Sequence, residues 1–184
     1  MNPITTPLEI EKNHLAGLLE AIQRCVYFLN ASSQDLQWPL QGGYLAEHKK
    51  DKHLFEALAA INERFAKLQD TLGAAMRHSL VLSGEQADSF IKVLAIFEKN
   101  GVVQSIETWQ VARAARNLAA HDYETDYQLV ADHFNALQAQ FAMLNQTAFR
   151  FVRYAQDVLK ISPQSTDFSV EFTQIASESS AVNN

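Results

Sequence analysis

The sequence contains few of the residues that build turns and cross-links. Its 184 residues include one cysteine, six glycines and four prolines, and glycine and proline together make up less than half of their usual share. A single cysteine excludes a disulfide framework and a zinc site made of several thiolates. The shortage of turn-forming residues argues against a sandwich, barrel or propeller of many strands.

Long apolar runs and an excess of basic residues are also missing. No run of about 18 apolar residues exists, so we expect no membrane-spanning segment. The first twelve residues hold no basic stretch followed by an apolar one, which leads us to expect a cytoplasmic protein without an export signal. The formal net charge is −6. Because a protein that binds nucleic acid over its whole surface should be basic, any contact with RNA or DNA must be local.

Apolar residues recur at helical spacing in the first half of the chain. A capping box formed by Thr6 and Glu9 predicts a helix that starts there and ends near Asn30. A polar, irregular loop is expected over about residues 31–50. The next helix has inward positions at steps of three and four: Leu54, Leu58, Ile61, Phe65, Leu68, Leu72 and Met76.

The second half shows the same spacing. A capping box at Ser83 predicts a third helix, which should end at Asn100-Gly101 because glycine is common at helix C-termini. A fourth segment starts near Ser105 and extends to about His121. A further capping box at Thr125 opens the longest helix, with these inward positions: Tyr127, Val130, Phe134, Leu137, Phe141, Leu144, Ala148, Phe151, Ala155 and Val158.

These elements predict an all-α protein with one helical domain over residues 1–160. We expect an up-down four-helix bundle whose third helix is broken in two. Residues 161–184 are expected to form a loose, partly disordered tail. Within it Phe168, Val170 and Phe172 alternate with other residues, which indicates a short strand or a segment that clips onto the bundle.

Five polar side chains stand out in an alanine-rich stretch. Arg113, Asn117 and His121 are spaced four apart and share one stripe of a helix, whereas Arg116 and Tyr123 share another. Arg116 and His121 lie about 140° apart on an ideal helix. They can face one small substrate only if the helix distorts or a second copy of the chain supplies the partner group. The alternative interpretation is a structural one, in which arginine pairs with Asp122 or Glu124 and the histidine caps the helix.

The pattern Arg116-Asn117-x-x-x-His121-x-Tyr123, near the end of a bundle helix, resembles the signature of the HEPN superfamily. It is most similar to the HepT-like toxins encoded beside a minimal nucleotidyltransferase. The resemblance spans about residues 8–160 and implies a HEPN-like bundle and metal-independent cleavage of RNA.

The resemblance assigns a role to each residue of the motif. His121 would act as the base for the 2′-OH of RNA, since imidazole titrates near neutral pH. Arg116 would stabilise the charge that builds on the phosphate, and Asn117 would orient His121. Arg113 would add positive charge in the substrate cleft. Tyr123 would accept AMP from the nucleotidyltransferase, which blocks the cleft and inactivates the toxin.

The implied partners are a second copy of the chain, the antitoxin nucleotidyltransferase and an RNA substrate. HEPN proteins pair two motifs across a two-fold axis, which would bring Arg116 and His121 together. We expect no cofactor and no metal, because Glu11 and His14 form an E-x-x-H pair without the second copy that a di-iron bundle needs. A second hypothesis is a non-catalytic four-helix subunit that binds a minimal nucleotidyltransferase.

Overall fold

The computed structural model describes residues 6–117 and 125–181, and within these ranges every regular element is a helix. In chain order the elements are α1 (Pro7–Gln34), α2 (Gly42–Glu47), α3 (Lys52–Leu82), α4 (Phe90–Lys99), α5 (Ile106–Asn117), α6 (Tyr127–Gln138), α7 (Phe141–Tyr154), the π turn η2 (Ala155–Leu159) and α8 (Ser169–Ala181). The expectation of an all-α protein is confirmed.

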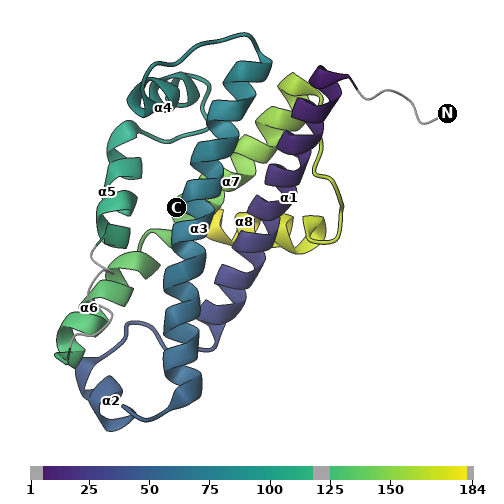
Figure 1. Ribbon diagram of the computed structural model, residues 1–184. Coiled ribbons are helices and arrows are strands. Elements are labelled where there is room, and N and C mark those ends of the chain that lie inside the picture. Colours follow the sequence, from purple (N-terminus) through teal and green to yellow (C-terminus); the bar gives the residue numbers. More distant parts are fainter. Residues whose placement is uncertain (1–5, 118–124, 182–184) are drawn as a thin grey trace.

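Two long helices form the centre of the molecule. α1 and α3 lie side by side in Figure 1, and α7 contacts both. Inward positions that the apolar spacing predicts are fully buried, for example Ile22 in α1, Phe65 in α3 and Phe151 in α7. Burial of each such side chain contributes about 1.5–3 kcal/mol. The finer assignment, an up-down four-helix bundle of HEPN type, stays a prediction.

Two of the helix ends lie where the sequence predicts them, and a third does not. The Thr6 hydroxyl accepts from the N–H of Glu9 at 3.3 Å, and the Glu9 carboxylate accepts from the N–H of Thr6 at 2.7 Å, so the first capping box is confirmed. Gly101 follows α4 with a φ of 71°, which glycine adopts without strain. The capping box expected at Ser83 is wrong: Ser83 ends α3, and the Ser89 hydroxyl caps α4.

The long helix expected from Tyr127 to Val158 is divided. α6 ends and α7 begins around Ala139 and Gln140, where the N–H of Gln140 donates to the carbonyl of Leu137 at 2.9 Å. The two halves share α3 but otherwise have different neighbours: α6 packs on α2 and α5, and α7 packs on α8 and α1. Apolar steps of three and four continue through the break and therefore do not reveal it. Val158 is 58% exposed rather than inward, because it lies in the π turn.

The loop expected over residues 31–50 is partly helical. It contains α2, which packs closely on α6. A Cβ on Gly42 would lie 2.7 Å from the Cα of Gln128, so only glycine fits this contact. The N–H of Leu40 donates to the Asn135 side chain at 2.8 Å, and the Asn135 amide donates back to the Leu40 carbonyl at 3.0 Å. The segment thus fastens the first half of the divided helix.

The segment expected to be a tail over residues 161–184 contains the helix α8 rather than a short strand, so the strand is wrong. The alternative, a segment that clips onto the other helices, agrees with its packing. α8 packs against α7 and α1. Phe172, Ile175 and Ala176 are buried, while Val170 is 76% exposed. The buried positions follow the i, i+3, i+4 spacing of a helix, so the alternation of apolar residues at the start of this segment did not reflect a strand.

Candidate functional site

α5 carries the described part of the motif. Its first turn is capped by the Ser105 hydroxyl, which accepts from the N–H of Thr108 at 3.0 Å. Trp109, Ala112 and Ala115 form the buried face of the helix. The indole of Trp109 packs on the ring of Phe90, with the centroids 5.8 Å apart, which joins α5 to α4. This apolar face packs toward the core through Trp109 and two alanines and leaves the charged residues on the remaining surface.

The predicted site residues fall partly within the described chain. Arg113 and Asn117 are exposed on α5, and Arg116 is half-buried near its end. His121 and Tyr123 lie outside the described residues. The structure therefore shows where Arg116, Asn117 and Arg113 lie. The convergence of Arg116 and His121 stays a prediction.

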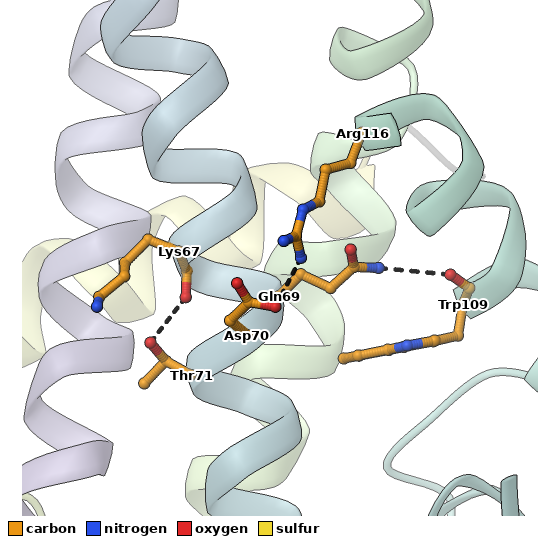
Figure 2. A network of polar contacts seen from close by, with 6 residues as sticks. All are labelled: Lys67, Gln69, Asp70, Thr71, Trp109 and Arg116. Carbon is orange, nitrogen blue, oxygen red and sulfur yellow. Dashed lines mark hydrogen bonds and ion pairs between the residues drawn. The ribbon is translucent and has the colours of Figure 1, made fainter. Parts of the chain in front are cut away.

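Arg116 forms an ion pair with α3. Its Nη1 donates to Oδ1 of Asp70 at 2.6 Å, as Figure 2 shows. The Arg116 side chain is 29% exposed and the Asp70 side chain 62% exposed. Because the carboxylate is largely in water, the pair lies at the surface rather than in the core.

A second contact from α3 holds α5 in place. Gln69, the neighbour of Asp70, is buried, and its Nε2 donates to the carbonyl of Trp109 at 3.4 Å. Gln69 and Asp70 thus contact α5 two helical turns apart, at Trp109 and at Arg116. The Oε1 atom of Gln69 is buried without a hydrogen-bond partner among the described residues. These contacts hold the C-terminal half of α5 against α3.

The strength of the Arg116–Asp70 pair decides whether the guanidinium can act on a ligand. Ion pairs at the surface contribute about 0–1 kcal/mol, because water competes for the charges; here water reaches the Asp70 carboxylate more freely than the Arg116 guanidinium. A phosphate can bind a guanidinium through two parallel hydrogen bonds. A phosphodiester can therefore replace Asp70 at Arg116 at small cost in stability.

The chain is also anchored after the motif. Asp126 caps the start of α6, since its carboxylate accepts from the N–H groups of Gln128 and Leu129 at 2.9 and 3.3 Å. The cap expected at Thr125 is therefore displaced by one residue. α6 is fastened in turn by α2, so fixed helices flank residues 118–124 on both sides.

A cleft of about 610 Å³ lies between the other flank of α5 and the junction of α6 with α7. Its lining includes Glu107 and Thr108 from α5 and Met143 and Arg150 from α7. Neither Arg113, Arg116 nor Asn117 lines it, so this cleft is separate from the described part of the motif.

The residues that bind metals in other proteins do not gather in the described chain. In residues 6–117 and 125–181, no group of three or more histidine, cysteine, aspartate or glutamate side chains could hold a metal ion. Near Glu11, the His14 and His78 rings lie edge to face with centroids 4.8 Å apart. The Nε2–H of His78 donates to the backbone carbonyl of Glu11 at 2.8 Å, so this pair joins α1 to α3.

Asp70 and Gln69 are the site residues that sequence reasoning missed. The partners considered for an arginine of the motif, Asp122 and Glu124, lie outside the described residues. Asp70 is 46 positions from Arg116, and no local pattern links two residues at such a separation. An alignment of related sequences could reveal the pair through co-variation.

No protein-family model, curated protein or solved structure matches this chain. Within the part of the chain that the structure describes, no helix has both the length and the apolar character needed to cross a membrane. The function therefore has to be argued from the motif and its surroundings.

Proposed function

We propose that this protein is a HEPN-like, metal-independent endoribonuclease that acts as the toxin of a toxin–antitoxin pair. The observation that carries the proposal is the position of Arg116. The guanidinium lies at the surface end of α5, five residues before His121, and its partner is an exposed carboxylate. The Arg116 guanidinium is permanently charged and presents several N–H donors, and the Asp70 carboxylate competes for it only weakly. Such a group is suited to bind a phosphodiester.

The reaction follows from the chemistry of RNA. His121 takes the proton of a 2′-OH, and the 2′-oxygen attacks the adjacent phosphorus. A bond forms between the 2′-oxygen and phosphorus, while the bond from phosphorus to the 5′-oxygen breaks. The proton is returned to the 5′-oxygen, so the products carry a 2′,3′-cyclic phosphate and a 5′-hydroxyl. Arg116 stabilises the negative charge on the phosphoryl oxygens.

The other residues of the motif support this reaction or control it. Asn117, exposed at the last turn of α5, orients His121, and the exposed Arg113 attracts substrate. A homodimer joins Arg116 of one protomer with His121 of its partner. A minimal nucleotidyltransferase transfers AMP from ATP to the hydroxyl of Tyr123: the tyrosine oxygen bonds to the α-phosphorus, the hydroxyl proton is lost, and pyrophosphate leaves. The added phosphate competes with RNA for the arginines.

The Arg116–Asp70 pair also favours a second function. A carboxylate 2.6 Å from the guanidinium neutralises it in the free protein, and the chain as a whole carries −6. Both features suit a non-catalytic subunit that docks a nucleotidyltransferase through polar contacts. In that case Arg116 holds α5 on α3 and contacts no phosphate.

Cleavage of RNA by purified protein in the presence of a chelator separates these functions. We expect the wild type to cleave RNA, and Arg116→Ala or His121→Ala to abolish cleavage while the far-UV circular dichroism stays unchanged. Arg150→Ala is the matched control, since Arg150 is exposed and lines the separate cleft. Cleavage by both variants at the wild-type rate would refute the catalytic assignment. A wild type that binds a nucleotidyltransferase and shows neither cleavage nor a mass gain of AMP would support the docking subunit.

A further inference from the structure

Three cationic side chains of α1 and α3 lie near one another. Arg24 of α1 and Arg64 of α3 approach the same Phe28 ring, and Lys67 follows Arg64 by three residues on α3. The carboxylates of Glu63 and Asp70 flank Lys67 along α3, and the chain as a whole carries −6. We call Arg24, Arg64 and Lys67 the α1–α3 patch.

The patch is free of carboxylate partners in the part of the chain that the structure describes. Five ion pairs occur there, and they include Arg116, Lys92 and Arg153 among their cations. None of the five includes a member of the patch. Arg24 and Lys67 are exposed, so their charges are available to an anion from solution.

The two arginines of the patch are held in place by an aromatic ring. The guanidinium carbons of Arg24 and Arg64 lie 5.9 and 5.2 Å from the centroid of the Phe28 ring. Arg64 also donates to the Phe28 carbonyl at 3.3 Å and to the Ser32 hydroxyl. The ring itself packs on Phe168, with centroids 6.1 Å apart. Because the ring is occupied in this way, we expect contacts to phosphates rather than stacking of bases.

The patch continues toward the candidate site along α3. Lys67 precedes Asp70 by three residues, a rise of about 4.5 Å along the helix, and Asp70 holds Arg116. Figure 2 shows Lys67 on the side of α3 toward α1, and Arg116 reaching α3 from α5 on the other side. A strand that leaves Arg116 therefore has to cross the surface of α3 to meet Lys67 and the arginines beyond it.

We infer that the α1–α3 patch binds the phosphate backbone of single-stranded RNA next to the phosphodiester held by Arg116. The inference rests on the proposed ribonuclease function and assigns the surface that positions its substrate. Phosphates neutralise Arg24 and Lys67, and Glu63 and Asp70 repel the strand, so binding is modest and strongly salt-dependent. Backbone contacts carry no sequence information, so the patch gives affinity without base preference.

Binding is measured by fluorescence anisotropy with a labelled DNA strand. This probe has phosphates but no 2′-OH, so it cannot be cleaved by the proposed reaction. The test variant combines Arg24→Gln with Lys67→Gln and leaves Arg64 intact, because Arg64 is hydrogen-bonded within the fold. The matched control combines Lys49→Gln with Lys50→Gln, two exposed lysines after α2, and changes the net charge equally. Circular dichroism and thermal melting check that both variants fold.

We expect the test variant to bind about tenfold more weakly or worse, with the slope of log K against log salt smaller by about 1.4. The control should bind within twofold of the wild type. Equal weakening in both variants would overturn the inference, because only net charge would matter. Unchanged binding in the test variant, with RNA cleaved normally by the wild type, would overturn the inference and leave the ribonuclease function standing. A wild type that neither binds the strand nor cleaves RNA would overturn both.

Discussion

Replacing Asp70 with asparagine tests whether this residue competes with substrate for Arg116. A unit charge about 4 Å away contributes about 1 kcal/mol in a water-like medium, and the Asp70 side chain is 62% exposed. Removing the charge should therefore favour phosphate at Arg116 by about fivefold. We expect kcat/KM for RNA cleavage to rise by that factor in Asp70→Asn.

The same substitution should affect stability little. An exposed ion pair contributes about 0–1 kcal/mol, which lowers the Tm of a chain of this size by no more than about 2–4 °C. Asp88→Asn is the matched control, since it removes a charge from another exposed pair, Asp88 with Lys92 at 2.5 Å. We expect the control to cleave like the wild type. If Asp70→Asn lost activity as completely as Arg116→Ala, Asp70 would be required to position the arginine, and the competition argued here would be wrong.

Three further predictions concern the fold around the site. Gly42→Ala should destabilise the protein by about 1–3 kcal/mol, because the new Cβ meets the backbone of α6 at 2.7 Å. Gly43→Ala should not destabilise it, because the space around Gly43 is open. Equal melting curves for the two variants would refute this prediction. Phe172→Ala should cost about 3–5 kcal/mol in denaturant unfolding, while exposed Val170→Ala costs little; equal losses would show that α8 is not docked as described. Burial, with a smaller effect of a nearby glutamate, raises the pKa of the Cys25 thiol, so its alkylation should begin at higher pH in the folded chain than in urea. The stability that the protonated Cys25 thiol contributes is present below the pKa of the thiol in the unfolded chain and is lost as the pH rises through its pKa in the folded chain. Alkylation profiles that coincide for the folded chain and the chain in urea would contradict the burial of this thiol.

Much of the core could be predicted from the sequence, because the relevant signal is local. Steps of three and four place Leu58 and Phe65 on one side of α3, and both are buried. The cap at Thr6 and the end of α4 at Gly101 follow from the chemistry of single residues. The motif on α5 is also a local signal, because Arg113, Arg116 and Asn117 interrupt an alanine-rich stretch of the sequence.

The rest depends on contacts between segments far apart in the chain. Around Gln140 the chain passes from α6, which packs on α2 and α5, to α7, which packs on α8 and α1, while α3 contacts both halves. The apolar spacing is the same on both sides. α8 looked like a loose tail because its buried face has few large residues, yet the i, i+4, i+7 positions at Phe168, Phe172 and Ile175 are a helical signal. The Arg116–Asp70 pair spans 46 positions and has no local signature.

The chemical ends of the cleavage products distinguish attack by the 2′-oxygen from metal-dependent hydrolysis. RNA is incubated with purified protein and excess chelator, and the new termini are identified by mass spectrometry. We expect a 2′,3′-cyclic phosphate on one fragment and a 5′-hydroxyl on the other, with neither formed by His121→Ala or Arg116→Ala. A 5′-phosphate product, cleavage that stops when metal is removed, or full cleavage by both variants would contradict the proposed reaction.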